Sequence, residues 1–105
     1  MAQFTVYHNP NHRTRSDIPY LLNVQSDLLA ELRTRIVVPL ARSARLNDRT
    51  MATLTPTFEL EGQTLTLLTP QLAGIATQAL GEPVADWTVH RDQIIAALDF
   101  LLTGI

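Results

Sequence analysis

Few side chains in this sequence could do metal or acid–base chemistry. His8 and His12 lie four residues apart in a polar stretch, and His90 stands alone much later in the chain. A spacing of four brings two histidines to one face only in a helix, and Pro10 between them opposes a helix. We therefore expect solvated loop histidines and no metal site.

No other pattern indicates an enzyme or a cofactor-binding protein. Asp92 and Asp99 would share a helix face, but a rise of roughly 1.5 Å per residue places them too far apart to act as a pair. The chain has only 4 glycines and neither a phosphate loop nor a serine-nucleophile motif. It has no cysteine, which excludes disulfides and thiolate ligands. We expect no cofactor.

Two clusters of arginine are candidates for anion binding. The first contains His12, Arg13 and Arg15, and the second contains Arg42, Arg45 and Arg49. A histidine beside arginines could act on an RNA phosphodiester, or the clusters could be solvated loop residues. The net charge of −2 disfavours a broad electrostatic grip on nucleic acid.

The hydrophobic pattern predicts one mainly β domain, residues 1–105, that ends in a helix. The chain of 105 residues is 46% hydrophobic, which suits a single core. We expect strands at residues 3–7, 18–25, 35–40, 57–60, 63–69 and 75–80. Glu61-Gly62 suits a tight hairpin, whereas Pro39 should interrupt its strand and Gly81 should end the last strand.

The final segment has a helical period. Apolar residues at 94, 95, 98, 101 and 102 form one stripe, which Asp86 or Thr88 would cap and which ends near Gly104. No charged side chain follows Asp99, so the apolar end must be docked on the core, paired in a dimer or offered to a partner. No membrane span or signal segment is visible, and we expect a cytoplasmic protein.

Several segments, in order and at near-constant spacing, resemble the CcdB family, gyrase-poisoning toxins of type II toxin–antitoxin systems. They are Gln3-Phe4-Thr5-Val6-Tyr7, Val24-Gln25-Ser26-Asp27-Leu28-Leu29, Arg35-Ile36-Val37-Val38-Pro39-Leu40, Gly81-Glu82, Val84-Ala85-Asp86 and Gly104-Ile105. The resemblance implies an SH3-like, largely antiparallel β barrel or sheet with a small β wing and a C-terminal helix. It also implies a two-fold homodimer.

The resemblance further implies a toxin that binds the DNA gyrase A subunit and traps the gyrase–DNA cleavage complex without catalysing a reaction. The positions implied for gyrase binding are Leu28, Leu29, Asp99, Leu102, Thr103, Gly104 and Ile105. The family pattern differs at three of them. It has tryptophan where this chain has Thr103, asparagine where it has Asp99, and phenylalanine where it has Leu102.

A CcdA-type antitoxin is the second implied partner, whose disordered tail folds on the toxin and which carries the complex to operator DNA. The expected contacts are Arg13, Arg15, Arg42, Arg45, Arg49, Leu60 and Leu65. Two alternatives stay open. A MazF- or Kid-like endoribonuclease on the same fold would line an RNA groove with His12, Arg13 and Arg15. An inactive relative, suggested by Thr103, would bind only antitoxin.

Overall fold

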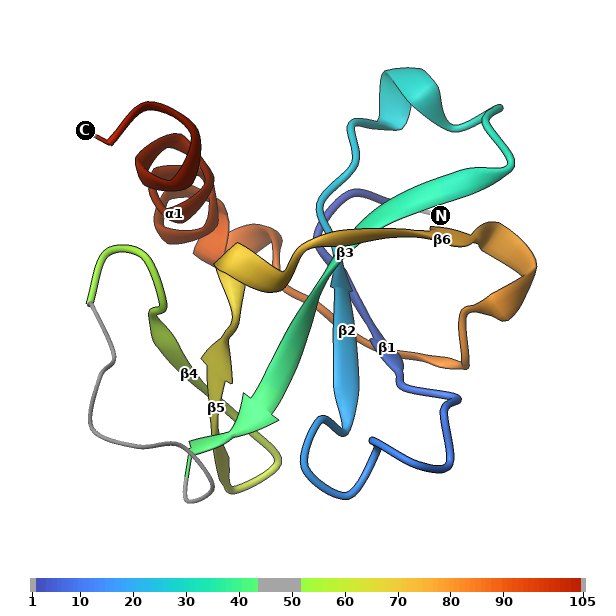
Figure 1. Ribbon diagram of the computed structural model, residues 1–105, viewed down its shortest axis with the longest axis horizontal. Coiled ribbons are helices and arrows are strands. Elements are labelled where there is room, and N and C mark those ends of the chain that lie inside the picture. Colours follow the sequence, from blue (N-terminus) through green and yellow to red (C-terminus); the bar gives the residue numbers. More distant parts are fainter. Residues whose placement is uncertain (1, 44–51, 105) are drawn as a thin grey trace.

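The described part of the chain, residues 2–43 and 52–104 of a computed structural model, forms one curled antiparallel sheet of seven strands (Figure 1). The strands are β1 (Thr5–His8), β2 (Tyr20–Asn23), β3 (Thr34–Arg42), β4 (Thr57–Leu60), β5 (Gln63–Leu67), β6 (Ala73–Ala76) and β7 (Pro83–Asp86). They hydrogen-bond in the order β4-β5-β3-β2-β1-β7, and β6 pairs with β3. With helix α1 (Arg91–Thr103) after the last strand, this half-barrel confirms the predicted fold class.

Short connections join these elements. Single helical turns occur at η1 (Asp27–Leu29), η3 (Thr69–Gln71), η4 (Thr77–Ala79) and η5 (Thr88–His90). The β4–β5 hairpin, called the wing below, turns at Glu61 (φ 52°) and Gly62 (φ 78°) as predicted. Two successive residues at positive φ match the right-handed twist of the flanking strands.

Strand β3 is shared by three neighbours. One edge pairs with β2, whereas the other edge pairs with β6 at residues 34–37 and with β5 at residues 40–42. Pro39 lies in the gap between β6 and β5, and its carbonyl accepts a 2.9 Å hydrogen bond from the Leu68 amide. Because the N–H and C=O of one strand residue point the same way, the donor that proline lacks faces this gap. The prediction that Pro39 interrupts the strand is therefore wrong.

The core joins the sheet to α1. Leu22, Leu40, Leu65 and Leu67 have no exposed surface, and they belong to the same buried cluster as Ile94 of α1. Phe4 and Val6 of the first strand segment point into this core, as predicted. Aromatic rings close one end, where Phe58 of the wing lies 4.9 Å from Trp87 and 4.7 Å from His90, centroid to centroid.

The last strand was not predicted. The expected strand at 75–80 is wrong, since β6 ends at Ala76 and η4 follows it, and β7 then begins at Pro83 and pairs with β1. Proline is tolerated as the first residue of an edge strand, where no ladder hydrogen bond is required of it. The Trp87 amide then donates to the Phe4 carbonyl at 2.8 Å, which fixes the exit of β7 toward the helix.

The start of α1 also differs from the expectation. Asp86 Oδ1 accepts hydrogen bonds from the Thr88 hydroxyl and the Thr88 amide at the start of η5, and α1 begins three residues later at Arg91, so neither Asp86 nor Thr88 caps α1. These two hydrogen bonds lower the pKa of the Asp86 carboxyl. Within the described residues, no helix is long and apolar enough to cross a membrane.

Gly81 lies where the chain entering β7 crosses β1. A Cβ atom at residue 81 would come within 2.5 Å of the His8 carbonyl oxygen. The His8 amide donates to the Glu82 carbonyl at 2.9 Å, so the two segments cannot separate without losing that bond. We expect Gly81→Ala to lower the free energy of unfolding by about 1–3 kcal/mol, as overpacking does, measured by thermal and urea unfolding.

Gly74→Ala is the matched control. Its new Cβ would meet only the Ile36 side chain at 3.6 Å, an ordinary contact, and we expect a change within about 0.5 kcal/mol. Equal stabilities of the Gly81→Ala variant and the parent chain would contradict the close approach at residue 81.

Candidate protein-binding surfaces

Two adjacent leucines face solvent on η1. The exposed fractions are 94% for Leu28 and 48% for Leu29. Large apolar side chains that lie together on the surface are not buried in the chain's own core. Such exposed apolar groups are typical of partner-binding sites. Both leucines are among the positions that the family resemblance implies for gyrase binding.

Gln25 fixes the base of this turn. Its side chain is only 7% exposed. Its Oε1 accepts from the Ile36 amide at 3.2 Å and its Nε2 donates to the Leu29 carbonyl at 3.1 Å. The Gln25 side chain therefore joins the turn to β3. It supplies the Ile36 amide and the Leu29 carbonyl with the hydrogen-bond partners that the backbone of the loop does not give them.

The next two residues fix the top of the turn. Ser26 Oγ accepts from the Leu28 amide at 3.2 Å, a capping interaction. Asp27 Oδ1 accepts from the Gln3 amide at 2.8 Å, which joins the turn to the N-terminal segment. The polar residues before Leu28 thus hold in place the leucines that follow them.

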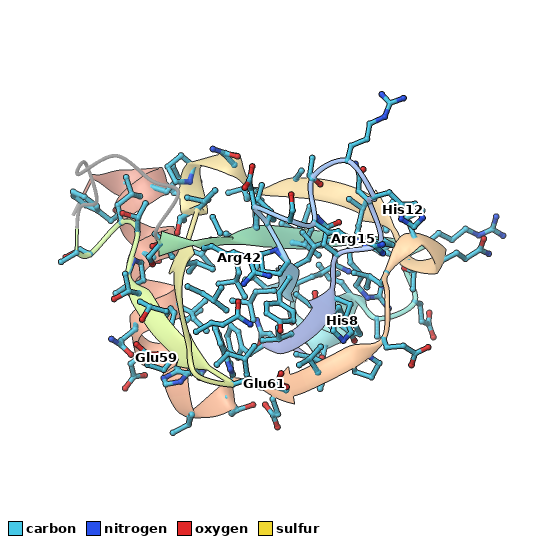
Figure 2. All side chains as sticks on the ribbon, turned by 90° about the horizontal axis from the view of Figure 1, so that it is seen from below. His8, His12, Arg15, Arg42, Glu59 and Glu61 are labelled. Carbon is cyan, nitrogen blue, oxygen red and sulfur yellow. The ribbon has the colours of Figure 1, made fainter. Side chains whose placement is uncertain are left out.

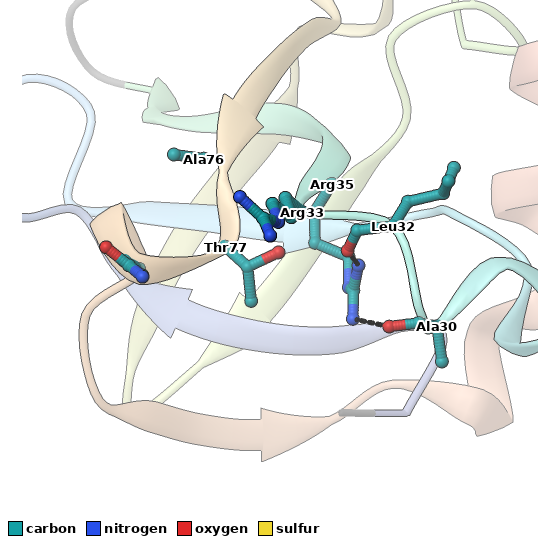
Figure 3. A pocket seen from close by; sticks show the side chains of 7 residues that line it. Ala30, Leu32, Arg33, Arg35, Ala76 and Thr77 are labelled. Carbon is teal, nitrogen blue, oxygen red and sulfur yellow. Dashed lines mark hydrogen bonds between the residues drawn. The ribbon is translucent and has the colours of Figure 1, made fainter.

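The guanidinium of Arg35 closes the same segment from inside (Figure 3). Arg35 is 5% exposed, and it donates from Nη2 to the Ala30 carbonyl at 2.7 Å and from Nη1 to the Leu32 and Thr34 carbonyls at 2.7 and 3.0 Å. Arginine stays protonated when buried, so backbone carbonyls rather than a carboxylate compensate its charge. The sequence reading missed this role and that of Gln25.

The charge of Arg35 also reaches the neighbouring Tyr7. Burial raises the pKa of the Tyr7 hydroxyl above its usual 10.0, and the Thr5 hydrogen bond and the charge of Arg35 oppose this rise. Desolvation is the largest effect, which agrees with the 4% exposed fraction of Tyr7. The Tyr7 hydroxyl therefore lies in a largely desolvated environment.

The end of α1 forms the second apolar surface. Ile94 is buried, Ile95, Leu98 and Leu101 are half-buried, and Leu102 is 76% exposed. The predicted stripe is thus confirmed over its first four positions. Leu102 does not pack on the core of this chain, because the last turn of α1 extends past the sheet (Figure 1).

The other tail positions are exposed as well. Thr103 Oγ1 donates to the Asp99 carbonyl at 2.7 Å, and the Gly104 amide donates to the Phe100 carbonyl at 2.9 Å. Gly104 has φ 75°, a left-handed helix cap that favours glycine. Ile105 lies outside the described residues.

These two apolar surfaces lie at one end of the molecule but on opposite flanks. Figure 1 shows η1 and the C-terminal end of α1 both at the top of the view, η1 at the right and the helix end at the left. The two surfaces therefore lie apart from each other in a single chain. A surface that uses both needs either a large partner or a second copy of the chain.

A group of basic side chains lies at the opposite end of the molecule from these two apolar surfaces. A cavity of about 500 Å³ brings together His8, His12, Arg15 and Arg42 (Figure 2). Arg42 Nε donates to the Ser16 carbonyl at 2.8 Å, and Arg42 also bonds Gln63 of the wing. Residues of both predicted arginine clusters thus line one hollow, called the arginine face below. Among the residues that the structure describes, no three metal-ligating side chains cluster.

The remaining expected antitoxin contacts divide into three groups. Arg13 is exposed in the loop that borders the arginine face, and Leu60 is half-buried against the core. Leu65 has no exposed surface, so it cannot contact a partner of the folded chain. It faces inward because its side of the wing is the side that covers the core. Arg45 and Arg49 lie outside the described residues.

Comparison with known protein families gives a match over nearly the whole chain. A family model described as CcdB protein matches residues 3–104. The matched range contains Arg35, the arginine face and the end of α1. It also contains η1 with its exposed pair Leu28 and Leu29, called the leucine turn below. Both exposed surfaces therefore belong to the family's own domain.

Replacing Arg35 tests how the leucine turn is held. We expect Arg35→Met to lower the free energy of unfolding by about 2–4 kcal/mol, because it leaves buried carbonyls without a donor. Amide hydrogen exchange should accelerate most at residues 27–33. Arg33→Met is the control, since Arg33 is exposed, and little change is expected there. Unchanged exchange at 27–33 in the Arg35 variant would contradict the role assigned to it.

Proposed function

The chain belongs to the CcdB family, gyrase-poisoning toxins of type II toxin–antitoxin modules, and from this premise we propose that it binds the DNA gyrase A subunit and traps the gyrase–DNA cleavage complex. The observation that carries the proposal is the exposed pair Leu28 and Leu29 on a turn fixed by side-chain hydrogen bonds. A preordered apolar pair loses little conformational entropy on binding, which favours affinity. The toxin itself catalyses no reaction in this proposal.

The end of α1 provides the second part of the gyrase surface. Asp99, Leu102, Thr103 and Gly104 are all exposed there, and we include Ile105 from the family pattern. A two-fold homodimer that packs the half-buried Leu98 and Leu101 against a second copy would bring two such tails together. Two-fold contacts are the commonest assembly of small chains, and a dimer would also supply the joined surface that one chain lacks.

The arginine face suits the acidic tail of a CcdA-type antitoxin. Arg15 and Arg42 line the same hollow, and Arg13 borders it. Arginine forms bidentate hydrogen bonds with carboxylates. We keep Leu60 and, from the sequence, Arg45 and Arg49 as contacts, and we drop Leu65. An antitoxin bound here would carry the complex to operator DNA, with no DNA contact by the toxin.

The leucine turn is tested by one charge. We expect Leu28→Glu to abolish gyrase poisoning, measured as loss of stabilised cleaved DNA with gyrase and ATP, because a carboxylate cannot enter an apolar site unpaired. Stability should change by less than about 0.5 kcal/mol, since Leu28 is 94% exposed.

Val89→Glu is the matched control, because Val89 is 84% exposed but lies on η5, away from the leucine turn. It should poison gyrase like the parent chain. Full activity of the Leu28→Glu variant would remove the leucine turn from the site. Cleavage of RNA by the purified protein without metal would favour the ribonuclease alternative instead.

Thr103→Trp tests the tail. The exposed position at the end of α1 can hold a large ring without disturbing the core, and aromatic anchors dominate many interfaces. We expect gyrase affinity to rise about tenfold, measured by titration with the purified A subunit, and the melting temperature to stay unchanged. If affinity falls or the protein loses stability, residue 103 packs against its own chain or dimer partner.

A further inference from the structure

A cavity of about 700 Å³ opens between residues 30–35 and the junction of β6 with η4 (Figure 3). We call it the Arg35 pocket. Its size falls within the range of ligand sites in proteins. It shares no lining residue with the arginine face, and neither Leu28 nor the end of α1 lines it.

Two cations line the Arg35 pocket without a carboxylate partner in the described chain. Arg35 is buried and uses three of its N–H groups on carbonyls of residues 30–34. Arg33 is exposed at the rim. A guanidinium has five donors, so Arg35 keeps donor capacity beyond its three carbonyl bonds, and Arg33 adds a second guanidinium.

An unpartnered hydroxyl lies in the same wall. Thr77 Oγ1 is buried and has no hydrogen-bond partner, although the Thr77 amide donates to the Arg33 carbonyl at 2.8 Å. Figure 3 shows this hydroxyl turned toward the two arginine side chains. Buried polar groups without a partner are rare, so this hydroxyl is a donor that a bound acceptor could use.

We propose that the Arg35 pocket binds the side-chain carboxylate of a glutamate in a peptide partner. The exposed Arg33 pairs with the carboxylate, the Thr77 hydroxyl is a further donor, and the Arg35 guanidinium keeps the floor of the pocket positively charged. Ala30, Leu32 and Ala76 line the rest of the pocket and contact the methylene groups of the glutamate. These apolar walls favour a carboxylate on an alkyl chain over inorganic phosphate.

The experiment uses the intact protein and two peptides that differ in one group. N-acetyl-Leu-Glu-amide should bind saturably in a titration followed by NMR, with the largest shifts at the amides of Arg33 and Thr77. N-acetyl-Leu-Gln-amide, which lacks only the charge, should bind at least about tenfold more weakly, because hydrogen bonds to a charged group are the stronger ones.

Thr77→Val is the decisive variant. It removes the hydroxyl while keeping the shape, so we expect about tenfold weaker binding of the glutamate peptide and no loss of thermal stability, because no hydrogen bond of the free protein is lost. Arg33→Gln should also weaken binding, and Arg91→Gln, at an exposed arginine at the start of α1 outside every proposed site, should not.

Three outcomes would overturn the proposal. Equal affinity for the two peptides would remove the carboxylate from the interaction. Unchanged binding by the Thr77→Val variant would place the peptide elsewhere. Inorganic phosphate binding at the same residues as tightly as the peptide would make the pocket a general anion site rather than a glutamate site. Because the test uses no gyrase, its failure leaves the proposed toxin function untouched.

Discussion

The buried guanidinium of Arg35 is the constraint on which the leucine turn depends. A charge that cannot shed its proton must be surrounded by acceptors when water is excluded. The chain supplies them by folding residues 30–34 back over the side chain, so that three carbonyls face inward. The turn that exposes Leu28 and Leu29 lies directly before this segment. The residues that follow the exposed leucines are therefore held in place by a buried polar group.

Strand β3 connects this constraint to the opposite surface. Arg35 lies near its start and Arg42 at its end, so one strand carries the basic residue of the Arg35 pocket and that of the arginine face. The gap at Pro39 separates their surroundings, because β6 accompanies the first part of the strand and β5 the second. Because β3 changes its pairing partner at this gap, the wing lies beside the end of the strand and the wall of the Arg35 pocket lies beside its start.

The sequence was sufficient where local chemistry decides the structure. Period-two alternation located most strands, Gly62 marked the hairpin, and the change of period marked α1. It was insufficient where distant partners decide. A short strand that starts at Pro83 has no local signal, and the role of Arg35 depends on carbonyls that only the folded loop brings to it. Leu65 was misplaced because a hairpin has two faces, and the curl of the sheet selects the buried one.

The pairing of β1 with β7 joins residue 5 to residue 86. Closing a loop of that length is entropically costly and slow compared with forming hairpins or helices. Since η5 and α1 follow β7, and α1 packs on a core built from the earlier strands, the place of the helix is set by this distant pairing. The exposed surface at the end of α1 therefore depends on the strand pairing that joins the most widely separated residues of the sheet.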